Sequence, residues 1–247
     1  MTKRPRIHLI DEIRGLAIIL MFFYHAFYML GYQFDFKLMS DAQKFFEPLQ
    51  PPFACLFILI SGYSSNLSHS NFKRGLRLLL ISLGFTAVTV LLLPKLGFYG
   101  AEIYFGILHL LSVSMLLFAL TQKLSAKIPE KVGIILCLLL FILTYSVQSG
   151  RLLFINLPDV LYANGFTAIF GFMPAGYYSA DYFPILPYVF MFFCGAFIGR
   201  YFEKNTLPRQ FYALHCRPLA AIGKKTLIIY ILHWPLIFVL GLIISKF

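Results

Sequence analysis

The sequence predicts an all-α integral membrane protein, a bundle of about seven transmembrane helices. Of its 247 residues, 60% are hydrophobic and only 13% are charged, and the mean hydropathy is +0.79. This composition is too apolar for an ordinary soluble domain of the same length. Several stretches contain the roughly 20 apolar residues that a membrane-spanning helix needs. Short polar segments separate them, so we treat residues 1–247 as a single transmembrane domain.

The apolar stretches define seven predicted spans, taken in chain order. They lie near residues 8–31, 50–67, 76–94, 101–121, 132–149, 183–201 and 222–245. The remaining long segment, 150–182, is rich in Gly, Pro and Tyr and contains Asp159, Asn164 and Asp181. We expect an extracytoplasmic loop or re-entrant hairpin there, between the fifth and sixth spans, because one extra span would invert every later loop.

The basic residues predict the orientation of the bundle. With alternating loops, 16 of the 21 Lys and Arg residues fall on the side of the N-terminus. The other side holds Lys37, Lys44, Lys95, Arg151 and Lys246. Cytoplasmic loops carry an excess of Lys and Arg, so we expect a multi-pass plasma-membrane protein with a cytoplasmic N-terminus. The net charge of +11 then reflects topology and the lipid bilayer, and we expect no nucleic-acid partner.

The first span carries polar residues along one helical face, namely Asp11, Arg14 and His25. Arg14 and His25 are three turns apart, roughly 16 Å along a helix axis. Arg14 would lie near the cytoplasmic interface, where it can hold a phosphate or pair with Asp11 or Glu12, and His25 would lie in the outer half of the bilayer. Ionisable groups at this depth are costly and tend to face a pathway. A simpler interpretation is that Arg14 only follows the positive-inside rule and that His25 only hydrogen-bonds to another helix.

Two more histidines reach a similar depth from other spans. His109 lies in the fourth span and His233 in the last, with Tyr230 on the same face as His233. Three histidines at one depth predict one polar cavity. Because no Asp, Glu or Cys accompanies them at ligand spacing within a helix, we expect no metal.

The end of the second span gathers small and hydroxylated residues around Ser61, just before Arg74 and Arg77. Small residues allow close helix packing, so one interpretation of this segment is tight packing alone. The other is a cytoplasmic entrance that is lined by cations and suited to an anionic nucleotide.

Five segments, in this order, resemble the transmembrane acyltransferase superfamily. They are 10–15 (IDEIRG) followed by His25, 60–63 (ISGY), 105–111 (FGILHLL), 179–188 (SADYFPILPY) and 222–226 (IGKKT) running to 233–235 (HWP). The likeness covers nearly the whole chain and is greatest to short bacterial relatives of heparan-α-glucosaminide N-acetyltransferase, of the catalytic-domain type. An Arg and a His separated by ten residues in the first span are also typical of bacterial polysaccharide O-acyltransferases.

The resemblance implies an acyl-CoA-dependent acyltransferase, usually an acetyltransferase. The donor would be cytoplasmic acetyl-CoA, used as a co-substrate, and the acceptor an extracytoplasmic sugar of a glycan or cell-envelope polymer. His25 would be the essential histidine and Arg14 its partner on the donor path. Lysosomal members are longer and carry Asn where this chain has His25, so heparan sulfate is not the expected acceptor.

Chemistry and resemblance together give a set of candidate site residues. We expect His25 to be the general base, with His109, His233 and Asp11 as further catalytic residues and His109, Tyr230 or His233 as oxyanion donors. The expected donor site is formed by Arg14, Ser61, Arg74 and Arg77. The expected acceptor site is formed by Asp181, Tyr182 and Tyr230.

Two other classes of function stay open at this point. A small polytopic transporter or flippase for an envelope precursor would also bury histidines and arginine. A non-enzymatic subunit would use the same residues for helix contacts alone. Direct transfer in a ternary complex is favoured over an acyl-histidine intermediate, and a homodimer is one option for the oligomeric state.

Overall fold

The computed structural model describes residues 7–205 and 209–245, and it confirms an all-α membrane bundle. Seven helical segments in this part of the chain are long and apolar enough to cross a membrane. They are His8–Gln33, Lys37–Ser65, Asn71–Leu96, Ile107–Ser125, Glu130–Ser149, Ile185–Lys204 and Thr226–Ile244. Their order and number agree with the seven spans predicted from the sequence.

The chain divides into two compact units. Unit 1 combines Met1–Ile60 with Thr206–Phe247, and unit 2 is Ser61–Asn205. The prediction of a single domain stays a prediction, because compact units inside a helical membrane protein need not be independent domains.

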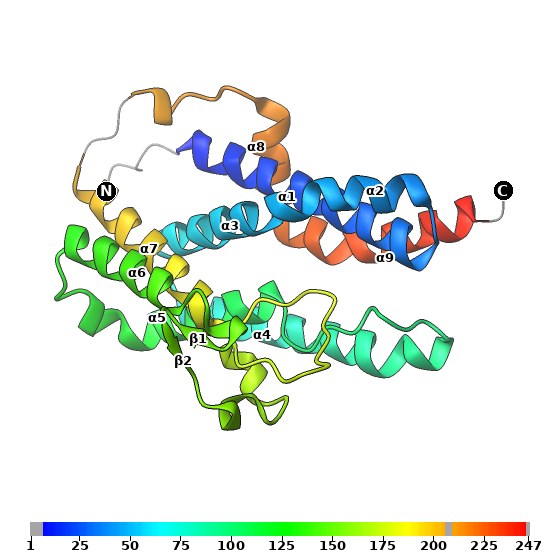
Figure 1. The fold of residues 1–247 in the computed structure, drawn as a ribbon. Helices are drawn as coiled ribbons and strands as arrows, with labels where there is room; N and C mark the ends of the chain where they lie inside the picture. Colours follow the sequence, from blue (N-terminus) through cyan, green and yellow to red (C-terminus); the bar gives the residue numbers. More distant parts are fainter. Residues whose placement is uncertain (1–6, 206–208, 246–247) are drawn as a thin grey trace. The chain divides into compact units, whose positions relative to one another are not determined.

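Unit 1 is built around the first helix. Helix α1 (His8–Tyr28) continues into a π-helical turn, Met29–Gln33, and packs against α2 (Lys37–Phe46), α8 (Arg217–Gly223) and α9 (Thr226–Ile244). Figure 1 shows α1 in blue beside α8 in orange. Gly15 and Gly223 leave no room for a Cβ, since one would meet the backbone of Leu219 and the other the backbone of Asp11. Helices α1 and α8 therefore touch backbone to backbone.

Helix α2 departs from the sequence prediction, which placed residues 32–49 outside the spans. The structure forms α2 and then a 3-10 turn, Glu47–Leu49, that leads into α3 (Gln50–Ser65). The charged residues Lys37, Asp41 and Lys44 are exposed on this amphipathic helix. Lys44 pairs with Asp41 at 3.3 Å along the helix surface.

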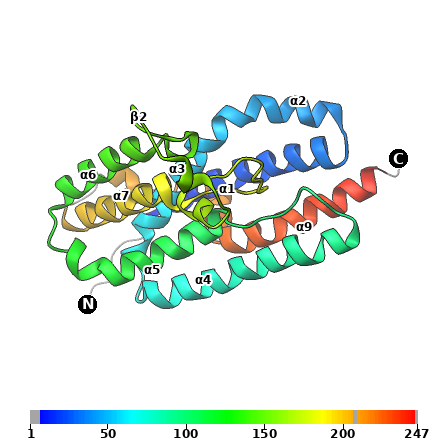
Figure 2. The same ribbon diagram turned by 60° about the horizontal axis from the view of Figure 1, so that its bottom comes forward.

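Unit 2 contains two helix pairs, which contact each other through α5 (Ile107–Ser125) and α7 (Ile185–Lys204). Helix α4 (Asn71–Thr86) packs on α5, α6 (Glu130–Thr144) packs on α7, and α5 also meets α7, as Figure 2 shows. Between α6 and α7 lies an apolar core of Cys137, Cys194 and Phe197. Burial of these side chains holds the pair together.

The segment between α6 and α7 contains no further span within the described residues. It holds a small antiparallel hairpin, β1 (Arg151–Leu152) and β2 (Ile155–Asn156), in which Arg151 is opposite Asn156. Two 3-10 turns, Asp159–Tyr162 and Thr167–Phe170, follow. The predicted non-spanning segment between the fifth and sixth spans is confirmed, and its side of the membrane stays a prediction.

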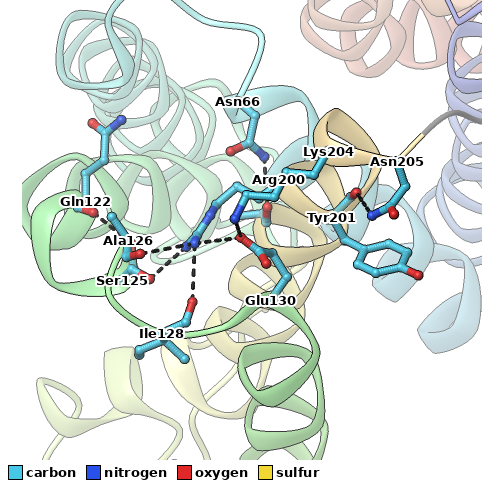
Figure 3. A network of polar contacts seen from close by, with 11 residues as sticks. Asn66, Gln122, Ser125, Ala126, Ile128, Glu130, Arg200, Tyr201, Lys204 and Asn205 are labelled. Atoms are coloured by element: carbon cyan, nitrogen blue, oxygen red, sulfur yellow. Dashed lines mark hydrogen bonds and ion pairs between the residues drawn. The ribbon is translucent and has the colours of Figure 1, made fainter.

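A polar network holds the connection between α5 and α6, as Figure 3 shows. The guanidinium of Arg200 on α7 donates to the carbonyl oxygens of Ser125 (2.7 Å), Ala126 (3.3 Å) and Ile128 (3.2 Å). It also pairs with Glu130 at 3.0 Å. Ser125 is the last residue of α5, and Ala126 and Ile128 follow it, so their carbonyl oxygens have no hydrogen-bond donors within the helix. Arg200 thus donates hydrogen bonds to carbonyl groups at the end of α5.

Candidate active site

Three aromatic rings gather inside unit 1. His25 lies in the last turn of α1, and His233 and Trp234 lie in the middle of α9, just before Pro235. The ring centroids of His25 and His233 are 5.0 Å apart, those of His25 and Trp234 5.7 Å, and those of His233 and Trp234 6.4 Å. All three side chains are buried, with 5%, 1% and 9% exposure respectively.

Each of these rings has a buried nitrogen that hydrogen-bonds to nothing within the described residues. The atoms are Nδ1 of His25, Nε2 of His233 and Nε1 of Trp234. Leaving a buried polar atom unpaired costs about 1–3 kcal/mol, so three in one cluster need an explanation. Binding of a polar ligand is the explanation that a functional site provides.

The second nitrogen of His233 defines the tautomer of that ring. Nδ1 of His233 lies in hydrogen-bond contact with the carbonyl oxygen of Tyr230, one turn earlier on α9. A carbonyl oxygen can only accept, so the proton of the neutral ring is on Nδ1. Nε2 therefore carries the lone pair. His233 is arranged to accept a proton rather than to donate one.

At the other end of α1, Arg14 fastens α8. Its Nη1 lies 3.3 Å from Oδ1 of Asp11 and 3.4 Å from the carbonyl oxygen of Gly223, the last residue of α8. The neighbouring carboxylate of Glu12 accepts hydrogen bonds from the backbone N–H groups of His215 (2.7 Å) and Cys216 (3.1 Å). These contacts hold the residues that lead into α8 against α1. Arg14 and Asp11, both predicted site residues, thus have structural partners.

His109, in unit 2, is a fully paired core histidine. Its Nδ1 accepts from the backbone N–H of Gly106 at 3.2 Å, which puts the proton on Nε2. Nε2 then donates to Oγ1 of Thr86 at 3.2 Å, and that hydroxyl donates to the carbonyl oxygen of Ile103 at 2.8 Å. Both ring nitrogens are occupied, in contrast to His25 and His233. The bonds join the start of α5 to α4 and to the chain before α5.

Asp181 and Tyr182 lie on the chain just before α7 and make buried structural contacts. Oδ2 of Asp181 accepts from the N–H of Ile107, the first residue of α5, at 3.0 Å. A carboxylate at a helix N-terminus also complements the helix dipole. The hydroxyl of Tyr182 donates to the carbonyl oxygen of Ala168 at 2.7 Å. Burial raises the pKa of the Tyr182 phenol above its ordinary value, so it remains a hydrogen-bond donor at neutral pH.

The remaining predicted donor residues lie at the start of unit 2. Ser61 is half-buried on α3, while Arg74 and Arg77 are exposed on the first turns of α4. Oγ of Ser70 accepts from the N–H of Lys73 at 3.3 Å and caps α4. Cations near a helix N-terminus are opposed by the helix dipole, so a bound anion would relieve that repulsion.

The structure thus brings together some predicted residues within each unit. In unit 1 it groups His25 with His233 and Tyr230, and it pairs Arg14 with Asp11. In unit 2 it places His109 and Asp181 together at the start of α5. The single cavity with three histidines stays a prediction, because the histidines belong to different units.

Trp234 is the residue that sequence reasoning missed. It is the only tryptophan in the chain and follows His233 directly, which could have drawn attention to it. On an apolar helix a tryptophan reads as packing or as a membrane-interface anchor. Among the described residues, no group of three or more His, Cys, Asp or Glu side chains could hold a metal ion.

Comparison with known proteins assigns the chain to a family. The family model described as "Heparan-alpha-glucosaminide N-acetyltransferase, catalytic" matches residues 6–235. No curated protein and no solved structure matches the chain. The family match covers all of α1 and the first half of α9, and so includes His25, His233 and Trp234. The chain is therefore a multi-pass membrane protein that belongs to the heparan-α-glucosaminide N-acetyltransferase catalytic family, a family of acetyltransferases.

Proposed function

We propose that this protein transfers an acetyl group from cytoplasmic acetyl-CoA to a hydroxyl or amino group of an extracytoplasmic sugar in a glycan or cell-envelope polymer. The observation that carries the proposal is the buried pair of imidazoles, His25 and His233, each with an unpartnered nitrogen, in a chain of this family. The excess of basic residues on the side of the N-terminus supports a plasma-membrane protein whose N-terminus is cytoplasmic.

His25 acts as the general base in this proposal. Its ring takes the proton from the acceptor O–H or N–H as that atom attacks the carbonyl carbon of the thioester. The new C–O or C–N bond forms, the C–S bond breaks, and the proton passes to the departing thiolate to give free CoA. His233, with its lone pair on Nε2 and its ring 5.0 Å from His25, can share the proton. Transfer is direct, without an acyl-enzyme.

The donor is held by cations, with its acetyl group directed toward the histidines. Arg14, Ser61, Arg74 and Arg77 contact the phosphates and the long arm of CoA in this proposal, and Asp11 orients Arg14, 3.3 Å away. Arg14 and His25 share α1 and are eleven positions, and therefore roughly 16 Å, apart along its axis. That length suits a donor whose charged end and reacting end are far apart.

Asp181, Tyr182 and Tyr230 are proposed to bind and orient the acceptor. In unit 1, Tyr230 lies beside His233, with ring centroids 5.1 Å apart. In unit 2, His109 supports Asp181 by holding the start of α5, where the two side chains bond to the adjacent N–H groups of Gly106 and Ile107.

The test uses purified protein in lipid nanodiscs with labelled acetyl-CoA and a panel of amino sugars and glycans. We expect thiol release and label transfer that depend on one acceptor. His25→Gln should lower kcat by about 100-fold or more, as expected for loss of a general base, and leave CoA binding intact. His69→Gln, which alters an exposed histidine in the turn before α4, is the control and should behave as wild type.

Donor binding is tested separately at the exposed cations. Arg74→Gln and Arg77→Gln should weaken CoA binding without loss of fold, because both side chains are exposed. Lys123→Gln, at an exposed cation near the end of α5, should not weaken it. The proposal fails if wild-type protein neither binds CoA nor releases thiol with any acceptor. Flux of a labelled precursor without acetyl-CoA turnover would instead identify a transporter.

A further inference from the structure

The three unpartnered nitrogens in unit 1 differ in what they can bind. Nε2 of His233 is an acceptor, because the Tyr230 carbonyl holds the proton on Nδ1. Nδ1 of His25 can serve in either sense. Nε1 of Trp234 carries a hydrogen at every pH and can only donate. The cluster thus offers a base and a fixed donor to one ligand.

Acyl transfer needs both kinds of group. As the acceptor attacks the thioester, negative charge develops on the carbonyl oxygen, and a positioned N–H that points at this oxygen lowers the barrier. His233 cannot supply that N–H in its neutral form, since its proton is already donated to Tyr230. Of the unpartnered buried side-chain atoms in the described chain, only Nε1 of Trp234 is a permanent N–H donor.

We propose that Trp234 is a catalytic residue whose Nε1–H donates a hydrogen bond to the carbonyl oxygen of the acyl group. This inference rests on the proposed function and identifies the hydrogen-bond donor for the acyl carbonyl oxygen in the same site. The ring centroid of Trp234 is 5.7 Å from that of His25, so the proposed donor and the proposed base are close enough to act on one acyl group. The indole is 9% exposed, and its N–H is buried, so solvent does not compete for the bond.

The first test replaces the indole while it keeps an aromatic ring. Trp234→Phe should lower kcat by about 100-fold, because it removes one oxyanion donor, and should change CoA affinity little. Replacing Trp234 with benzothienylalanine keeps the shape of the side chain and removes only the N–H. It should produce the same loss, and it covers the case in which Trp234→Phe does not fold.

The second test does not depend on turnover. Trp234 is the only tryptophan, so the intrinsic tryptophan fluorescence of the protein comes from this side chain alone. A CoA analogue with a ketone in place of the thioester should shift the emission to longer wavelength, because a hydrogen bond stabilises the excited indole. An ethyl-CoA thioether, which lacks the carbonyl, should bind without that shift.

The outcomes separate this inference from the function on which it rests. If wild-type protein transfers acetyl groups, while the benzothienylalanine protein retains its kcat within about threefold, the role of Trp234 is wrong and the function stands. Equal emission with the ketone and thioether analogues overturns the role as well. If no acetyl transfer occurs but the ketone analogue alone shifts the emission, the acyl-carbonyl contact stands and the proposed transfer fails.

Discussion

Replacing Arg200 with alanine should destabilise unit 2 through the end of one helix. Arg200 donates to three carbonyl oxygens at and after the end of α5 and pairs with Glu130. Its side chain is 17% exposed and that of Glu130 13%, so solvent replaces these bonds only in part. The substitution leaves the carbonyl oxygens of Ala126 and Ile128 without this donor, while that of Ser125 keeps the N–H of Ile128 at 3.1 Å.

The contacts set the expected magnitude. A hydrogen bond to a charged group contributes about 1.5–3 kcal/mol, and only two of the four Arg200 contacts are 3.0 Å or shorter. Glu130 keeps Lys204 as a partner at 2.7 Å, so it does not become an isolated charge. We therefore expect a loss of about 2–3 kcal/mol. For a chain of this size that corresponds to a fall in the unfolding temperature of about 4–12 °C.

The assay follows the reaction of a thiol-specific fluorescent dye during heating in detergent. Cys137 and Cys194 are buried between α6 and α7 and become reactive when unit 2 unfolds. The matched control is Lys204→Ala, which removes the other partner of Glu130. Its side chain is 66% exposed, so we expect a loss of at most about 1 kcal/mol. Arg200→Lys should resemble Arg200→Ala, because an ammonium cannot reach the same set of carbonyls.

One result would refute this reasoning. If Arg200→Ala and Lys204→Ala unfold at the same temperature, the carbonyl contacts contribute nothing and Arg200 serves only as one of several basic residues at this end of unit 2.

Three further substitutions test other contacts. His109→Phe should lower the free energy of unfolding by about 2–4 kcal/mol in the same thermal assay, because it leaves buried polar groups of two elements unpaired; a wild-type unfolding temperature would contradict the pairing. Gly223→Ala should also destabilise the protein, since its Cβ would overlap the α1 backbone, whereas Gly84→Ala has open space and should be neutral or stabilising. Tyr182→Phe should remove a loss of folding stability that the wild-type protein shows at alkaline pH. Because burial raises the folded pKa of this phenol, its contribution is full below the ordinary pKa of 10.0 and is lost as pH rises from there through the folded value; equal loss of stability at high pH in both proteins would exclude this role.

The sequence predicts the spans well and the connections less well, for a physical reason. A span is a local property, since about 20 apolar residues in a row suffice, and the predicted and observed spans share most of their residues. Helix α2 was missed because its charges resemble those of a loop. The hairpin of β1 and β2 consists of four residues in two short strands, too few for an alternating pattern to be recognised.

For the site, the sequence identifies the residue types but not their partners. The stripe on α1 predicts that Arg14 and His25 share a face, because helical spacing is local. The bond between His109 and Gly106 follows the local spacing of a helix N-cap and its third residue, but the bond to Thr86 comes from another helix and no spacing rule predicts it. The same holds for Trp234, whose unpartnered N–H becomes visible only when all neighbouring acceptors are known.

Unit 1 is built from two segments that are far apart in the sequence, and this affects how the chain is inserted into the membrane. Helix α1 is synthesised before the partners that α8 and α9 supply, which lie about 200 residues further along the chain. At about 5–20 residues per second, the ribosome needs roughly 10–40 s to produce them. During that time the polar groups of Glu12 and Arg14 lack the contacts that α8 and the residues before it provide. We expect a nascent chain that stalls before α8 to keep α1 bound to insertion factors, and completion of α9 to release it.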